Sequence, residues 1–333
     1  MSILMIGIDG MSKQHFERAM PETRNFLLEK KGAIELYKYN NFAAWITHDD
    51  SDLAYQGNEA YHKFLQDLVA TDSLNNTVIF WFSDHGPRFG PIRETYHGRI
   101  ETSTPYIFFV FPPWFKRKYP QLISTHKINQ NSLSSHFDVY ETIRDLLYLK
   151  NLPRKNGSQK ERGISLFREI PRERTCDNAG IPGEFCACGR FSKPKMNATS
   201  LQVLGATLLR RVNSFIGFSS PEIHNTSKTF TVSDPSHSSS GQLATSGRIK
   251  SEDSKIPASA GEFTSKCTRL SLVRVESVYQ VTNDQLQSLK KKSYRVTIRT
   301  APGLALFEAL INYEPGKSSH VAVDAVRINI YRG

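Results

Sequence analysis

The chain has 333 residues, of which 39% are hydrophobic and 23% are charged, and its formal net charge is +11. This composition is typical of a water-soluble folded protein, and the length exceeds what one domain usually requires. The positive charge alone would suit nucleic acid, an anionic membrane or an anionic substrate. The basic residues are scattered, however, and no nucleic-acid-binding motif accompanies them, so we expect no nucleic-acid partner. No apolar stretch is long enough to cross a membrane, and the first residues read as a strand, not as a signal peptide.

The first half of the chain alternates between strand and helix patterns. Short apolar runs predict strands at residues 2–8, 33–39, 77–83 and 105–111. Apolar residues at helical spacing predict helices at 12–30, 58–69 and 135–149. The dipeptide Met20-Pro21 interrupts the first of these helices. Strands that alternate with helices predict an α/β core.

The second half of the chain changes its pattern twice. Residues 200–216 predict a short helix, and residues 217–262 lack the apolar side chains that a core needs, which is typical of a linker or flexible loop. From residue 264 onward apolar residues recur with a period near two. The strand candidates are 270–278, 293–299, 305–311 and 320–331. They predict a small antiparallel β unit at the C-terminus.

Three of the four cysteines, Cys176, Cys186 and Cys188, lie within thirteen residues, and Cys267 is a candidate partner for this cluster. Zinc is one explanation, but Cys-x-Cys is not the usual zinc spacing, so a local disulfide framework is favoured. Glycosylation sequons begin at Asn75, Asn156, Asn197 and Asn225. Cysteines and sequons together favour an oxidising compartment, extracellular or in the secretory pathway.

Two apolar runs end in an acidic residue close to glycine. Residues 3–8 lead into Asp9, and residues 78–83 lead into Asp84 and His85. Such runs are typical of buried parallel strands, and functional groups of open α/β sheets gather at the carboxyl ends of those strands. Two carboxylates and an imidazole are suitable ligands for zinc or manganese. A turn or helix cap is the alternative role for each aspartate.

Seven segments carry a resemblance to a known family. They lie at 6–12, 20–23, 82–90, 111–115, 137–142, 176–188 and 326–331. The aspartate after the first strand and Ser-Asp-His-Gly after a later one resemble the alkaline phosphatase superfamily. Together the segments more closely resemble an uncharacterised sulfatase-like family of animal extracellular proteins. The resemblance implies a mostly parallel sheet flanked by helices, and metal-dependent hydrolysis or transfer at phosphate or sulfate esters.

By this resemblance Asp9, Asp84 and His85 would be the metal ligands. His48 and Arg88 are candidates for binding an anionic ester substrate, since an arginine can hold such a group in a bidentate manner. For His48 an exposed position is the alternative, and for Arg88 a solvated guanidinium is the alternative. His97 and His136 are interpreted as surface or helix residues.

The chain departs from the family where the nucleophile is expected. Members of the family place a threonine in an Asn-Thr-x-Pro segment, whereas here residues 39–42 pass directly to 43–50, which resemble a later part of the domain. Thr47 lies near the expected distance from Asp9, but its neighbours differ, and the sulfatase Cys-x-Pro-x-Arg motif is absent. The middle of the domain is thus expected to be missing. The catalytic residue is unknown, and a non-catalytic metal-binding or extracellular binding protein, or a splice fragment, is the alternative to an enzyme.

The sequence therefore predicts four regions. They are a shortened alkaline-phosphatase-like core at 1–175, a cysteine-rich tail and helix at 176–216, a flexible linker at 217–262 and a small β unit at 263–333. The substrate and the oligomeric state are left open.

Overall fold

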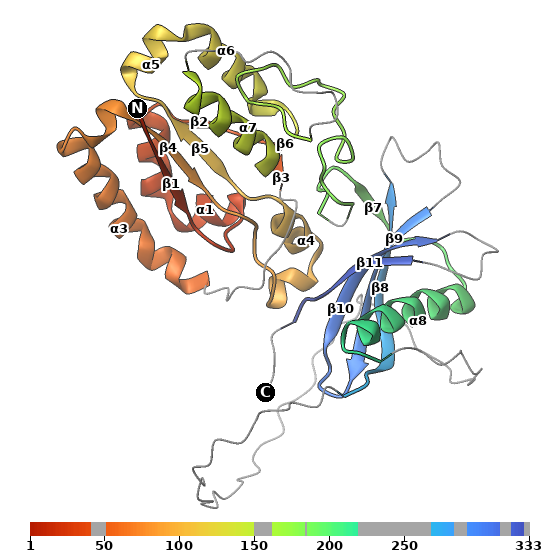
Figure 1. The fold of residues 1–333 in the computed structure, drawn as a ribbon. Coiled ribbons are helices and arrows are strands. Elements are labelled where there is room, and N and C mark those ends of the chain that lie inside the picture. Colours follow the sequence, from red (N-terminus) through yellow and green to blue (C-terminus); the bar gives the residue numbers. More distant parts are fainter. Residues whose placement is uncertain are drawn as a thin grey trace, which may run out of the picture.

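The structure is a computed structural model of the whole chain. It describes residues 1–40, 51–149, 162–183, 185–218, 268–282, 292–313 and 321–329. Figure 1 shows an α/β core built from the first half of the chain, beside a second body in which a long helix accompanies an antiparallel sheet. His48, Thr47 and Cys267 lie outside the described residues, as does the expected linker beyond Phe218.

The core sheet has the strand order β1-β4-β5-β2. β1 (Ser2–Gly7) and β4 (Thr77–Phe82) are parallel, with Ser2 opposite Thr77. β5 (Ile107–Val110) pairs antiparallel with both β4 and β2 (Ile34–Glu35). The expectation of a mostly parallel sheet is therefore wrong for the described strands, and the sheet is mixed. The reason is the connection after β4, because α4 (Tyr96–Ser103) lies near the end of the sheet and does not cross its face (Figure 1), so the chain returns in the opposite direction.

Helices cover both faces of this sheet. One face packs against α1 (Lys13–Ala19), the π-helical turn η1 (Phe26–Lys30) and α3 (Ser51–Ala70), and α2 (Pro21–Asn25) lies against these helices. The other packs against α5 (Pro113–Lys118), α6 (Pro120–Ile128) and α7 (His136–Leu147). Successive side chains of β4 alternate between the faces, so Phe80 enters one core and Trp81 the other, and both are fully buried. The predicted break at Met20-Pro21 is confirmed, because Pro21 begins α2.

Some local predictions differ from the structure. The single strand expected at 33–39 is divided, because a turn at residues 37–38 separates β2 from β3 (Tyr39–Asn40), which pairs in parallel with β6 (Ser134–Ser135). The helices predicted at 58–69 and 135–149 from apolar spacing contain Phe64 and Leu147, yet these two side chains are 42% and 68% exposed. β1 was expected to be buried, yet it is an edge strand among those described.

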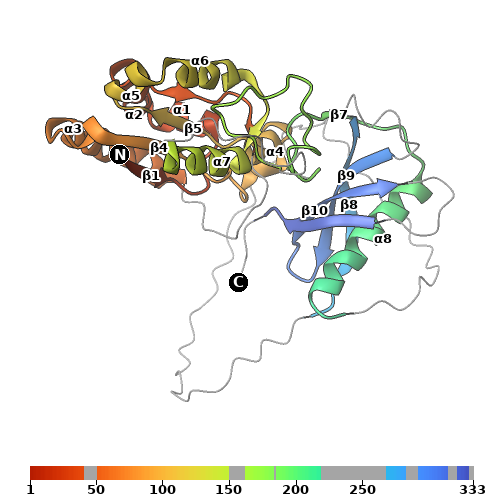
Figure 2. The same cartoon turned by 45° about the horizontal axis from the view of Figure 1, so that its top comes forward.

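The second body contains an antiparallel sheet of five strands in the order β11-β10-β9-β8-β7. The strands are β7 (Arg190–Ser192), β8 (Ser271–Thr282), β9 (Lys292–Ala301), β10 (Leu306–Tyr313) and β11 (Val321–Arg327). Helix α8 (Ala198–Phe215) lies against one face of this sheet (Figure 2), with Leu204 and Leu208 fully buried. The predicted antiparallel unit is confirmed, and β7 is a fifth strand from the cysteine-rich segment. None of the described helices combines the length and apolar character needed to cross a bilayer.

Candidate metal centre

The structure brings Asp9, Asp84 and His85 together at one edge of the core sheet. Asp9 follows β1, and Asp84 and His85 follow β4. The Ile8 amide donates to the Phe82 carbonyl at 2.9 Å and extends the pairing of the two strands up to these residues. One ligand atom from each of the three side chains lies within 4.8 Å of the others. This convergence follows from the parallel register, because the carboxyl ends of neighbouring parallel strands meet at the same edge.

His85 is oriented by its own loop. Its Nδ1 lies 2.7 Å from the Gly86 carbonyl oxygen, which can only accept a hydrogen bond, so Nδ1 donates. In the neutral ring Nε2 then carries the lone pair, at 3.5 Å from Asp9 Oδ1 and 3.2 Å from Asp84 Oδ2. The ring is fully buried, and Nε2 has no hydrogen-bond partner among the described residues. A carbonyl that fixes the second ring nitrogen is typical of metal-binding histidines.

The two loops that carry these side chains are held by the backbone. Asp84 Oδ1 accepts from the Gly10 amide at 3.2 Å and from the His85 amide at 2.9 Å, which leaves Oδ2 facing the centre. Gly10 has φ +68°, a conformation that favours glycine. At Gly86 a Cβ would lie 2.0 Å from the Glu101 carbonyl oxygen, so only glycine lets this loop pack against α4.

A positive charge would stabilise the arrangement of these three side chains. Two carboxylates and an imidazole lone pair face one another, and either a cation or a proton on Nε2 relieves their repulsion. The side chains of Asp9 and Asp84 are 49% and 37% exposed, so an ion can reach them from solvent while His85 closes the buried side. One nitrogen and two carboxylates form a donor set that fits zinc or manganese. A proton on His85 is the alternative that a binding experiment must exclude.

His136 is a neighbour of the centre that the sequence interpretation missed. It begins α7 and lies partly buried, with its ring 4.9 Å from that of Tyr39. Burial lowers the pKa of His136 to about 4, although the charge of Asp84 raises it. Burial, and then the charges of Asp138 and Asp84, raise the pKa of Tyr39. No local sequence pattern marks His136, because it stands near Asp84 only through the pairing of β6 with β3. His97 is exposed on α4, as expected.

Arg88 is not the solvated residue that the alternative interpretation expected. Its exposed fraction is 8%, and it lies in the loop directly after His85. It lines a cavity between the two bodies and not an open surface.

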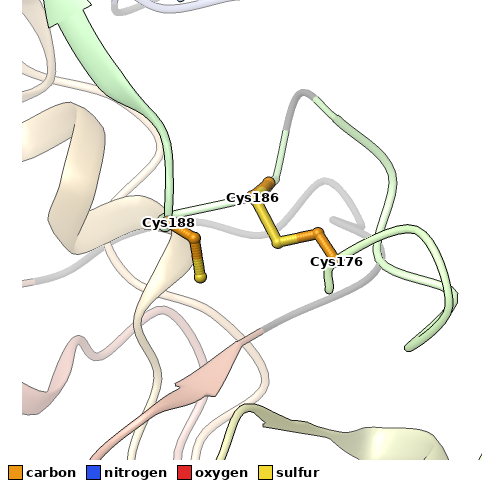
Figure 3. Close-up of side chains that lie close together, drawn as sticks. All are labelled: Cys176, Cys186 and Cys188. Atoms are coloured by element: carbon orange, nitrogen blue, oxygen red, sulfur yellow. A yellow bond between two sulfur atoms is a disulfide. The ribbon is translucent and has the colours of Figure 1, made fainter. Parts of the chain in front are cut away.

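The cysteine cluster forms a second candidate site, shown in Figure 3. Cys176 and Cys186 form a disulfide, as the prediction of a local framework requires, with a Cα–Cα distance of 6.0 Å. Cys188 lies beside this bond with an exposed, free thiol. The three sulfur atoms lie within 4.8 Å of one another, but two of them are covalently paired, and a disulfide sulfur is a poor metal ligand compared with a thiolate. This cluster therefore favours a structural role over a zinc site.

One of three comparisons with known proteins identifies the family of the chain. The family model described as "Protein of unknown function (DUF229)" matches residues 1–44 and 41–219, so the chain belongs to this family of uncharacterised sulfatase-like proteins. The match is divided into two segments that meet at residues 41–44, the position where the sequence predicts that the middle of the domain is missing. No curated protein and no solved structure matches the chain.

Proposed function

We propose that the chain is a sulfatase-like protein with an alkaline-phosphatase-like core that binds one zinc or manganese ion through Asp9, Asp84 and His85. The observation that carries this proposal is the buried Nε2 of His85, which is aimed at two carboxylates while its Nδ1 is held by a carbonyl. A dication would fill this geometry and neutralise the two carboxylates. Such an ion, when bound, lowers the pKa of a coordinated hydroxyl and shields an anionic ester.

Other groups of the protein hold the three ligand side chains in place. His85 is locked by Gly86, Asp84 is fixed through two backbone amides, and Asp9 completes the set from the neighbouring strand. His136, whose pKa is lowered to about 4, is neutral near pH 7 and adds no positive charge that would repel the cation. These features support cation binding without any further residue.

Ester hydrolysis needs a nucleophile, and the segment that carries it in the family is expected to be missing from this chain. We therefore propose that the chain binds such esters without fully hydrolysing them. The family match is divided at residues 41–44, where the Asn-Thr-x-Pro segment is expected. Phosphate and sulfate esters would then bind as anions without forming the covalent intermediate of the parent superfamily. The disulfide between Cys176 and Cys186 supports an extracellular or secretory location, because such bonds persist in oxidising compartments.

The test is a calorimetric titration of the metal-free chain with Zn²⁺ and with Mn²⁺. We expect one ion per chain, and a loss of affinity of about a hundredfold or more in Asp84→Ala. Asp67→Ala is the matched control, because Asp67 is an exposed carboxylate on α3 outside the centre. Equal binding by wild type and Asp84→Ala would refute the metal centre. Hydrolysis of p-nitrophenyl phosphate or sulfate that disappears in Asp84→Ala would keep the centre and refute the non-catalytic proposal.

A further inference from the structure

A cavity of about 520 Å³ lies between the core and the C-terminal sheet. Its wall comes from the loop that carries Arg88, from the end of α8 at Phe215, and from β10 at Phe307 and Leu310. The volume lies within the range of roughly 300–1,000 Å³ that is typical of sites for small organic ligands. None of the three residues of the metal centre is among the described residues that line it.

One part of the wall is apolar. Phe89, Phe185, Phe215, Phe307 and Leu310 all contribute to it. Phenylalanine side chains have no polar group, so this part of the wall suits the apolar body of a ligand and not a sugar or a metal ion.

The rest of the wall is cationic. Four arginines line the cavity, whereas Glu308 is the sole carboxylate among the described lining residues. Arg88, Arg93 and Arg295 are 8%, 4% and 7% exposed, so their charges lie in the interior, where water screens them poorly.

The single carboxylate is already engaged. Glu308 Oε1 accepts from Arg93 Nη2 at 2.9 Å and from Arg295 Nη1 at 3.1 Å, and Oε2 accepts from Arg99 Nε at 2.7 Å. Burial acts to raise the pKa of Glu308, but the attraction of Arg93, Arg295 and Arg99 outweighs it and holds this pKa well below the usual range. Arg93 Nη1 is buried and has no hydrogen-bond partner among the described residues. The wall therefore contains a buried donor without an acceptor beside an apolar hollow, and an anionic group satisfies such a donor.

We propose that this cavity binds a small amphiphilic anion, whose apolar body packs against the phenylalanine side chains and whose single carboxylate, sulfate or phosphate group pairs with Arg88 and Arg93. This site is additional to the metal centre and does not require an ion there.

The test uses two fluorescent probes that share one ring system, with the metal-free full-length chain. 8-Anilinonaphthalene-1-sulfonate carries an anionic group, and N-phenyl-1-naphthylamine lacks it. We expect one sulfonate molecule to bind per chain, about tenfold or more tightly than the neutral probe. Decanoate should displace the sulfonate, and decanol should do so only weakly. Equal affinity for the two probes, or no saturable binding, would overturn the proposal.

Two variants locate the site. Arg88→Gln should weaken sulfonate binding about tenfold and leave the neutral probe unchanged, whereas Arg117→Gln, at an exposed position on α5, should change neither. Ala325→Trp, in the wall of the cavity, should reduce binding of both probes while the chain still melts cooperatively. If Ala325→Trp does not fold, the response of Arg88→Gln decides, and unchanged sulfonate binding in that variant overturns the proposal. Sulfonate binding that persists in Asp84→Ala separates this site from the metal centre.

Discussion

His126 is a fully buried histidine within an aromatic cluster, and its replacement should make the core less sensitive to acid. It lies on α6, with ring centroids 4.5 Å from Phe109, 5.4 Å from Phe111 and 5.9 Å from Phe167. Neither ring nitrogen has a hydrogen-bond partner among the described residues. Burial without a partner lowers the pKa of His126 from 6.5 to about 3.

The sign of the effect follows from proton binding. Between pH 6.5 and about 3 the unfolded chain binds a proton at His126 that the folded chain does not bind, so stability is lost as the pH falls below 6.5. Linkage puts the loss between about pH 7.5 and about pH 5 at about 2 kcal/mol. His126→Leu removes this contribution. It also removes two buried nitrogens without partners, so the variant should be at least as stable as wild type near neutral pH.

The assay is urea unfolding in the presence of EDTA at these two pH values, followed by tryptophan fluorescence. All three tryptophans precede residue 115, so the signal reports on the first part of the chain, which contains the core. The stability of His126→Leu should fall by about 2 kcal/mol less than that of wild type on acidification. His136 titrates in both proteins and cancels in the comparison, and His97→Leu, at an exposed position, should behave as wild type. Equal losses in wild type and His126→Leu would refute the reasoning.

Three further substitutions test the ion pairs of Glu308, the loop that carries His85 and the disulfide. Glu308→Gln leaves three buried guanidiniums without their carboxylate and should destabilise the chain by about 3–5 kcal/mol, whereas the exposed Glu94→Gln should leave the urea midpoint unchanged. Gly86→Ala places a Cβ 2.0 Å from the Glu101 carbonyl oxygen and should lower both zinc affinity and the melting temperature, and a variant equal to wild type would contradict the loop geometry. Cys186→Ser opens a loop with a sequence separation of 10 residues. The substitution should lower the free energy of unfolding, measured in urea, by about 2.7 kcal/mol. Dithiothreitol should lower it by a similar amount in wild type and should have no effect on this variant.

The meeting of Asp9 and Asp84 could be predicted because its signal is local. Each residue follows an apolar run, and β1 and β4 are parallel neighbours, so their carboxyl ends share an edge. His136 could not be found in this way. Its position near Asp84 depends on α7 beginning at β6, and β6 pairs with β3, which lies about a hundred residues earlier in the chain. β3 and β6 have two residues each, which is too few for a local sequence pattern to predict their pairing.

The direction of β5 was also beyond the sequence. Its apolar run, Ile107–Val110, predicts a buried strand whether its neighbours are parallel or antiparallel. The direction depends on whether the preceding connection crosses a face of the sheet, and α4 does not cross one. In the second body, by contrast, the alternation of side chains gave β8 to β11 correctly, because short connections between amphipathic strands favour antiparallel pairing. β7 was missed because three residues are too few to show a period.

β1 has the apolar composition of an interior strand, although it lies at the edge of the core sheet among the described strands. Ile3 packs against the core on one face of the sheet, and Leu4 and Ile6 pack on the other, which is typical of strands with neighbours on both sides. Among the described strands only β4 pairs with it, and Met5 is 48% exposed. The residues of the candidate metal centre are therefore held by strands of different stability. Asp84 follows β4, which has a neighbouring strand on each side, whereas Asp9 follows β1, which pairs with β4 alone among the described strands. Cation affinity should therefore depend more on how firmly β1 stays paired with β4 than on the loop of Asp84 and His85.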